Sequence, residues 1–158
     1  MKRIFVDDEI CTGCRYCEII CSLVHNDVVN PRKSRIRVMS DVFNGVDHPT
    51  VCRQCAKPPC ADACPVKAIR IDSKLKIPTV NESNCIGCMA CVEACPSNGI
   101  WFDFDRMVPI KCDLCSGDPK CVKFCREFPH VESSSIMYTT LENWVNKRSQ
   151  RKSKRSRL

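Results

Sequence analysis

Sixteen of the 158 residues in this chain are cysteines, and all of them fall into four groups of four. Groups one and three share the spacing C-x2-C-x2-C-x3-C, whereas groups two and four widen the middle gap to four and five residues. The chain is therefore a fourfold internal repeat in two forms. The groups are Cys11, Cys14, Cys17 and Cys21; Cys52, Cys55, Cys60 and Cys64; Cys85, Cys88, Cys91 and Cys95; and Cys112, Cys115, Cys121 and Cys125.

This spacing is typical of cubane iron–sulfur clusters. Three thiolates on a tight loop can bind one face of a [4Fe-4S] cluster, while the fourth Cys lies on the helix that follows. In the bacterial ferredoxin run that fourth Cys ligates the other cluster of a pair and is followed by proline. Cys64-Pro65 and Cys95-Pro96 match this run. We therefore expect four [4Fe-4S] clusters.

Disulfide bonds and zinc binding are the other uses of cysteine in such numbers. A disulfide framework needs an oxidising compartment and gives no reason for four copies of one spacing. Zinc ribbons use two C-x2-C pairs separated by a longer loop rather than three closely spaced cysteines. The alternative that remains beside the iron–sulfur interpretation is a zinc-rich protein that binds nucleic acid through a basic tail.

The formal charge of +7 is confined to the C-terminus. Residues 1–146 hold 18 Lys and Arg against all 18 Asp and Glu. Thiolate-ligated clusters are negatively charged and would offset the remaining excess, so nucleic acid is not an expected partner. The basic residues of the tail are Lys147, Arg148, Arg151, Lys152, Lys154, Arg155 and Arg157.

The apolar core that the chain can build is thin. Its hydrophobic fraction of 44% includes the sixteen cysteines, and it has only two Trp, two Tyr and six Phe. Cluster binding is therefore expected to be coupled to folding. The chain has no run of 18 apolar residues and no apolar signal segment at its start, so we expect no membrane span and a cytoplasmic protein.

The elements expected to position the cysteines are short. Gly13 and Gly87 should allow the tight turns of two ligand loops. Short helices should follow groups two, three and four, and Thr139-x-x-Glu142 resembles a capping box that begins a final helix. The other expected elements are a strand over Lys2–Val6, a helix over Tyr16–Leu23, a strand over Ile36–Met39, and hairpins of Ile69–Ile71 with Ile77–Val80 and of Trp101–Asp103 with Met107–Ile110.

Several residues beside the ligands could adjust the clusters. Apolar side chains are expected to shield them from water, and basic ones could raise their potentials or could simply be solvated charges. His25 could form a hydrogen bond near an outer cluster or a partner, or cap its helix. The apolar set is Ile19, Ile20, Ala63, Val66, Ile86 and Val92, and the basic set is Arg15, Arg53, Lys111 and Arg126.

The four groups in this order, with their widened gaps, resemble four-cluster ferredoxin-type electron-transfer subunits. Such subunits accompany molybdenum and tungsten oxidoreductases, hydrogenases and carbon monoxide dehydrogenases. The resemblance covers roughly residues 4–131. The stretch 11–25, followed by Asn30-Pro31 and Ser34-Arg35-Ile36, is most similar to the small subunits of tungsten aldehyde oxidoreductases of the aldehyde ferredoxin oxidoreductase type.

The resemblance implies an α+β fold of two intertwined bacterial-ferredoxin-like units, with little regular structure and with the clusters acting as core. Residues 1–48 and 106–138 would form an outer half and residues 49–105 an inner half. Residues 139–158 would be a C-terminal helix and basic tail. The family's arrangement places the clusters in the order group one, four, two, three.

The resemblance also implies which cysteines share a cluster, because the last Cys of each group is exchanged with a partner group. Groups one and four lack the proline after that Cys, which is a departure from the ferredoxin run. The implied sets are cluster 1, Cys11, Cys14, Cys17 and Cys125; cluster 2, Cys52, Cys55, Cys60 and Cys95; cluster 3, Cys85, Cys88, Cys91 and Cys64; and cluster 4, Cys112, Cys115, Cys121 and Cys21.

On this resemblance the chain is not catalytic alone. It carries no hydrolase, zinc-protease or phosphate-loop motif, and its histidines are His25, His48 and His130. The implied partner is a catalytic tungstopterin or molybdopterin subunit, with electrons passing to a flavin- or NAD-linked subunit or a ferredoxin. Further copies of the chain in a larger assembly are also expected. The alternative partners are a hydrogenase, a formate dehydrogenase and a carbon monoxide dehydrogenase.

Overall fold

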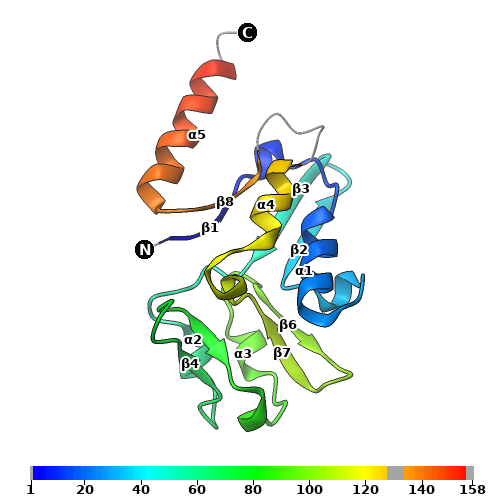
Figure 1. Cartoon of the computed structure of the whole chain (residues 1–158), viewed down its shortest axis with the longest axis vertical. Helices are drawn as coiled ribbons and strands as arrows, with labels where there is room; N and C mark the ends of the chain where they lie inside the picture. The colour runs from blue at the N-terminus through cyan, green and yellow to red at the C-terminus, as the bar shows by residue number, and fades with distance from the viewer. Residues whose placement is uncertain (1, 128–133, 156–158) are drawn as a thin grey trace.

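The computed structural model describes residues 2–127 and 134–155, so His130 and Arg157 lie outside the described residues. Short helices and two-stranded sheets alternate along the chain, as Figure 1 shows. The strands are β1 (Arg3–Val6), β2 (Ile36–Asp41), β3 (Val46–Val51), β4 (Ile69–Ile71), β5 (Pro78–Val80), β6 (Ile100–Asp103), β7 (Val108–Lys111) and β8 (Ile136–Thr139). The helices are η1 (Asp8–Ile10), α1 (Tyr16–Asn26), η2 (Pro31–Lys33), α2 (Pro59–Asp62), η3 (Glu82–Asn84), α3 (Ala90–Glu93), η4 (Leu114–Gly117), α4 (Lys120–Glu127) and α5 (Leu141–Arg155).

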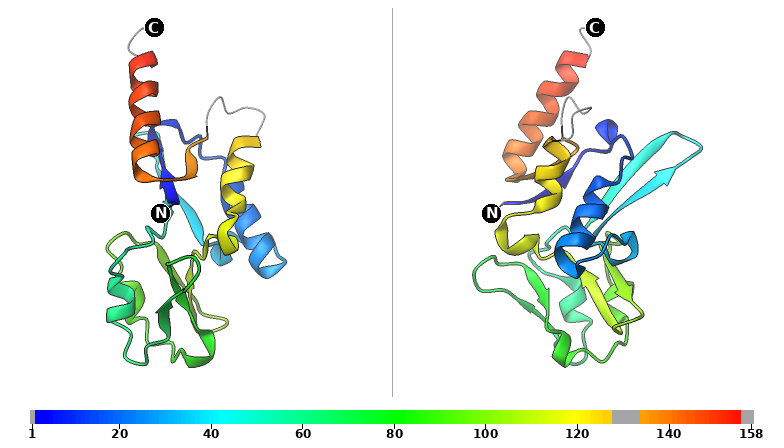
Figure 2. Two further views of the ribbon diagram at one scale, coloured as in Figure 1. Left: turned by 60° about the vertical axis from the view of Figure 1, so that its left-hand side comes forward. Right: turned by 45° about the vertical axis from the view of Figure 1, so that its right-hand side comes forward.

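Three of the four sheets are local hairpins and one joins the two ends of the chain. β2–β3, β4–β5 and β6–β7 are antiparallel neighbours in sequence. β1 instead pairs with β8, with Arg3 opposite Thr139 and Val6 opposite Ile136. Helices α1 and α4 pack together in the same region, and α2 packs on α3 in the other part of the molecule (Figures 1 and 2).

The predicted strands and hairpins are confirmed, with three differences. β3 and β8 were not predicted, and α1 extends three residues beyond Leu23. Helices α2, α3 and α4 do not follow their cysteine groups, since each contains the third Cys of its group. The third Cys is therefore held on the first turn of a helix.

The buried core is rich in cysteine. Among the 21 buried hydrophobic residues that the structure describes, seven are Cys, and they belong to both core groups. The larger core group gathers residues from both ends of the chain, such as Ile4, Ile36 and Ile136. The smaller one consists of Cys60, Ile69, Cys91 and Ile100. Thiols thus make up one third of the buried hydrophobic residues, beside aliphatic side chains.

Helix α5 lies against the N-terminal segment. Thr140 Oγ1 accepts a 3.5 Å hydrogen bond from the Asn143 N–H, so the capping residue is Thr140 rather than the predicted Thr139. The Trp144 ring stacks on Phe5 at 5.3 Å, and the Arg148 guanidinium lies 5.2 Å from the Trp144 ring centroid. The C-terminal helix is thus part of the folded body. No helix within the described residues is long and apolar enough to cross a membrane.

Part of the basic tail is neutralised within the chain. Asp7 is almost fully buried, and its carboxylate lies 3.8 Å from Arg148 Nε and 3.6 Å from Arg151 Nη1. Glu9 pairs with Lys152 at 2.9 Å and with Arg148 at 3.0 Å, and these contacts lower the Glu9 pKa. These three basic residues therefore face an acidic segment of their own chain.

The substitution Arg151→Ala is expected to destabilise the fold more than Lys152→Ala. Loss of Arg151 removes one of two cations from the buried carboxylate of Asp7, which should cost about 1–3 kcal/mol. Loss of Lys152 removes an exposed ion pair, whose contribution is small. Denaturant unfolding of the two variants measures the difference, and equal midpoints would show that Asp7 does not depend on Arg151.

Candidate metal centres

The thiols for which the structure reports neighbours lie in four neighbourhoods, each of which mixes two cysteine groups. In the first, burial raises the pKa of Cys17 most, followed by Glu18 and by the neighbouring Cys125, Cys14 and Cys11. A small cavity is lined by those same four cysteines. Cys125, from the C-terminal part of the chain, thus lies beside group one.

The second neighbourhood combines group four with Cys21. Burial raises the pKa of Cys121 well above its ordinary value, and Cys112, Cys21 and Cys115 raise it further. Burial also raises the pKa of Cys112 to about 12, with Cys52 and Cys21 among its neighbours. Groups one and four have therefore exchanged their last cysteines.

The remaining two neighbourhoods combine groups two and three. Burial raises the pKa of Cys60 to about 11, against a lowering by Lys111, and the neighbouring Cys52, Cys95 and Cys91 raise it further. Burial likewise raises the pKa of Cys91 to about 11, with added effects of Cys85, Cys88 and Cys64. The structure thus brings together the cysteines of each predicted set that these contacts report.

Each ligand loop has the same backbone turn. The residue before the second Cys of every group is left-handed, and its N–H donates to the sulfur of the first Cys. In groups two, three and four these N–H···Sγ distances are 3.4, 3.5 and 3.5 Å. The φ angles are +65° at Gly13, +52° at Gln54, +71° at Gly87 and +58° at Leu114. The predicted turns at Gly13 and Gly87 are confirmed, and Gln54 and Leu114 adopt the same turn without glycine.

A second repeated turn follows Cys64 and Cys95. The third residue after each Cys is left-handed, and the fourth donates its N–H to the Cys sulfur, from Ala68 at 3.2 Å and from Gly99 at 3.3 Å. Burial raises the pKa of Cys64, but its backbone hydrogen bonds outweigh burial and lower it. Such bonds stabilise a thiolate. Proline after the Cys ends the helix and frees the chain to make this turn.

Groups one and four lack that proline, so their helices continue past the last Cys. The N–H donor to Cys21 then comes from a different segment, Arg35 of the following loop, at 3.2 Å. Near Cys125 the contact is the Ser135 hydroxyl at 3.6 Å. These groups, which depart from the ferredoxin run, therefore take their sulfur contacts from other segments, while Cys21 and Cys125 still lie beside thiols of the other group.

Gly99 brings two cysteines of one set together. A Cβ at this position would lie 2.7 Å from both the N and Cα atoms of Cys52, and the Gly99 N–H donates to Cys95. Neither the proximity nor the donor was predicted from the sequence. Backbone atoms cannot move aside as a flexible side chain could.

The substitution Gly99→Ala is therefore expected to prevent assembly of the set that contains Cys52 and Cys95. We expect a loss of about four iron atoms per chain. Iron analysis of the purified variant measures this, with Gly45→Ala as a control because a Cβ there meets no atom within 4 Å. Full iron content in the Gly99 variant would contradict the close packing of these backbones.

Two of the sixteen cysteines are exposed, Cys14 and Cys88, and they belong to groups one and three. The predicted shield around the clusters is correct for Ile20, which is buried, but wrong for Ile86 and Val66, which are 63% and 37% exposed. Ile86 follows the first Cys of its group, where the tight loop turns its side chain outward. The loop of group three, which contains Ile86 and Cys88, is thus exposed to solvent.

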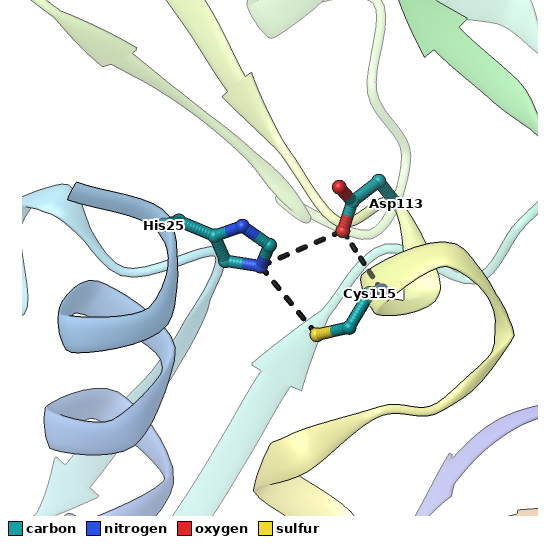
Figure 3. A group of neighbouring side chains, drawn as sticks. All are labelled: His25, Asp113 and Cys115. Carbon is teal, nitrogen blue, oxygen red and sulfur yellow. Dashed lines mark hydrogen bonds and ion pairs between the residues drawn. The ribbon is translucent and has the colours of Figure 1, made fainter. Parts of the chain in front are cut away.

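His25 lies beside a cysteine of group four, as Figure 3 shows. Its Nε2 atom is 3.5 Å from Cys115 Sγ and 3.6 Å from Asp113 Oδ1, and Arg35 pairs with the other oxygen of Asp113. Burial and then Arg35 lower the pKa of His25, while Asp113 raises it. These three ligand-type side chains lie within 4.8 Å of one another. Asp113 Oδ1 also accepts the Cys115 N–H at 2.9 Å, so the carboxylate is occupied by protein donors.

The donor set fits iron–sulfur clusters. Every gathered group consists of thiols, all sixteen of which are free, and the sulfurs accept backbone N–H bonds as cluster ligands do. Three polar residues that lie beside the thiols, Glu18, Gln54 and Asp113, were not predicted from the sequence. Their burial depends on contacts between distant segments, which no local pattern reports.

The chain resembles known iron–sulfur proteins. Residues 51–99 match the model of the 4Fe-4S dicluster domain. The chain is 43% identical to the polyferredoxin-like subunit of an aliphatic sulfonate oxidoreductase from Pyrococcus furiosus, over 80% of this chain and 73% of that protein. It is 31% identical to formate hydrogenlyase subunit 2 of Escherichia coli K12, over 78% and 77%.

The fold is similar to that of a chain in a solved structure, the active site complex BamBC of benzoyl coenzyme A reductase. The similarity covers 88% of this chain and 76% of that chain, with 27% identity and a TM-score of 0.51. It therefore extends well beyond the matched dicluster domain.

Proposed function

Because this chain belongs to the iron–sulfur electron-transfer subunits of oxidoreductase complexes, we propose that it holds four [4Fe-4S] clusters and connects a catalytic subunit to a further redox partner. The observation that carries this proposal is that free thiols from different cysteine groups lie beside one another on loops that share one backbone turn. Bound clusters supply reversible one-electron transfer. The chain's own residues bind them, exclude water and set their potentials.

The proposed ligand sets follow the contacts between thiols. The neighbours that cross between groups and support these sets are Cys17 with Cys125, Cys121 with Cys21, Cys60 with Cys95 and Cys91 with Cys64. Cys112 with Cys52, Cys121 with Cys17 and Cys60 with Cys91 are neighbours between different sets. The sets are cluster 1, Cys11, Cys14, Cys17 and Cys125; cluster 2, Cys52, Cys55, Cys60 and Cys95; cluster 3, Cys85, Cys88, Cys91 and Cys64; and cluster 4, Cys112, Cys115, Cys121 and Cys21.

We divide the chain into two intertwined ferredoxin-like halves. The pairing of β1 with β8 and the packing of α1 on α4 support an outer half of residues 1–48 and 106–138. The packing of α2 on α3 supports an inner half of residues 49–105. We assign residues 139–158 to a C-terminal helix and basic tail, of which the structure describes residues 139–155.

The exposed cysteines indicate where partners would approach. Cys14 belongs to cluster 1 and Cys88 to cluster 3, whereas the cysteines assigned to clusters 2 and 4 are buried or half-buried. Electron transfer between proteins requires a short path between redox groups. We therefore propose that one partner docks near Cys14 and the other near Cys88.

We propose a tungsten or molybdenum aldehyde oxidoreductase-type enzyme as the catalytic partner. Support comes from residues 11–25 and 30–36, which resemble the small subunits of tungsten aldehyde oxidoreductases. A hydrogenase or formate dehydrogenase is the second candidate, which the 31% identity to formate hydrogenlyase subunit 2 favours. The other partner would be a flavin- or NAD-linked subunit or a ferredoxin. Sixteen free thiols suit a reducing compartment such as the cytoplasm.

Isolation of the native complex tests the proposal. We expect about sixteen iron and about sixteen sulfide per chain, with a broad visible absorption that dithionite bleaches. Metal analysis of the copurifying subunit should find tungsten or molybdenum, and nickel would favour a hydrogenase instead. A colourless chain that contains zinc would overturn the electron-transfer function itself.

The substitution His25→Leu is expected to make one cluster harder to reduce. In the tautomer that carries its proton on Nε2, His25 donates an N–H to Cys115 Sγ. Such a donor stabilises the additional negative charge of a reduced cluster, so its removal lowers the potential. His25→Gln keeps an N–H donor and should retain most of the potential. Redox titration of both variants measures this, and equal shifts would assign the effect to packing rather than to the hydrogen bond.

A further inference from the structure

Lys111 is a buried cation beside the thiols of cluster 2. It lies at the end of β7 and is 5% exposed. No other Lys or Arg side chain that the structure describes is buried. Within the described residues, no carboxylate oxygen lies within 4.0 Å of its Nζ. Its positive charge opposes the burial that raises the pKa of Cys60. At Cys95 it adds to the hydrogen bonds from Ser97 and Gly99, which outweigh burial and lower the pKa. Burial of an ammonium group is unfavourable unless an opposite charge lies nearby.

Gln54 holds this cation in place. The Lys111 ammonium donates to Gln54 Oε1 at 3.3 Å, and Gln54 Nε2 donates to the backbone oxygen of Cys112 at 2.9 Å. Gln54 is fully buried and lies in the loop between Cys52 and Cys55. The Gln54 amide accepts a hydrogen bond from the ammonium group but carries no charge that could neutralise it. The thiolates of cluster 2 are therefore the counter-charge that justifies burial of Lys111.

Glu18 has the opposite sign and lies beside cluster 1. It is 2% exposed and follows Cys17, whose pKa it raises. Its Oε1 accepts the Val38 N–H at 2.7 Å, while Oε2 accepts no hydrogen bond. Two cations approach Glu18: Arg15, at 3.6 Å and with a 48% exposed side chain, and Arg37, whose pKa burial lowers and Glu18 raises. Solvent weakens the pairing with Arg15, and Arg37 forms no ion pair with Glu18 within 4.0 Å, so part of the negative charge remains next to cluster 1.

We propose that these two buried charges separate the cluster potentials, so that Lys111 makes cluster 2 the most easily reduced and Glu18 makes cluster 1 the hardest to reduce. The inference rests on the proposed function and its ligand sets. Reduction adds negative charge to a cluster, which a nearby cation stabilises and a nearby anion opposes. Beside cluster 4, Arg35 and Asp113 form an ion pair whose charges largely cancel. An electron that enters near Cys14 would therefore come to rest on cluster 2.

Redox titration of the iron-loaded full chain, monitored by electron paramagnetic resonance, tests the proposal. Lys111→Met removes the charge and keeps the length of the side chain, and we expect the highest of the four midpoint potentials to shift to a more negative value. Glu18→Gln keeps the acceptor for the Val38 N–H, and we expect the lowest potential to shift to a more positive value. Lys74→Met and Glu142→Gln remove the same charges at exposed positions and should leave all four potentials in place.

The titrations of the wild type and of the variants distinguish failure of the inference from failure of the proposed function. Wild-type protein without four reducible clusters would overturn the function and the inference together. Full iron loading with unchanged potentials in Lys111→Met, or shifts no larger than in Lys74→Met, would overturn the inference alone. If Lys111→Met does not assemble, Glu18→Gln decides, because it changes charge with almost no change in shape. An unchanged lowest potential in that variant would contradict the proposal.

Discussion

Removal of iron and sulfide is expected to leave the chain largely unfolded, without a cooperative thermal transition. Seven of the 21 buried hydrophobic residues that the structure describes are cysteines proposed to bind clusters. Beside these cysteines the two core groups contain ten buried aliphatic side chains, and no aromatic residue is among their buried members. Without the clusters, the conformational entropy of ordering loops with many left-handed residues has little burial to oppose it.

Circular dichroism and thermal melts before and after treatment with a chelator and an oxidant measure this effect. Reconstitution with iron, sulfide and thiol reductant should restore the transition, which controls for irreversible damage. A native-like spectrum with a cooperative melt in protein shown to contain no iron would contradict it. The packing around Ile36 and Ile136 would then be sufficient to hold the fold.

The fold was predictable from the sequence where contacts are local. The β4–β5 and β6–β7 hairpins lie within short alternating segments, and both were predicted. β8 pairs with β1 from the opposite end of the chain, so no adjacent turn in the sequence predicts this strand. β3 contains Pro49, which argues against a strand, but a two-stranded ribbon consists of edges that tolerate proline.

The residues of the site were likewise predictable where the signal is local. The cysteine spacing indicated all sixteen candidate ligands, and Gly13 and Gly87 indicated two of the four turns. Gln54 and Leu114 carry no such signal, because their strained backbones are imposed by the loop they share with two cysteines. The burial of Lys111 and Glu18 arises only when distant segments meet around the thiols. The sequence indicated Lys111 as one of four basic residues beside the ligands, but only the fold distinguishes it from the others by its burial.

Two double variants are expected to lose different amounts of iron, in a ratio that reports how the ligands are shared. Cys21→Ala with Cys112→Ala removes two thiols that are far apart in sequence but assigned to one cluster. Cys21→Ala with Cys11→Ala removes two thiols of one sequence group that are assigned to two clusters. The second variant should lose about twice as much iron as the first, about eight atoms against about four.

The comparison is matched, because both variants contain Cys21→Ala and each also removes the first Cys of a group. Its physical basis is the contact of Cys121 with Cys21 and of Cys17 with Cys125, which crosses between groups one and four. If each group instead bound its own cluster, the ratio would be inverted, since Cys11 and Cys21 would then share one cluster. Iron and sulfide analysis, with spin quantitation of the reduced clusters, distinguishes the two arrangements. An inverted ratio would also remove the reason for α1 and α4 to pack side by side.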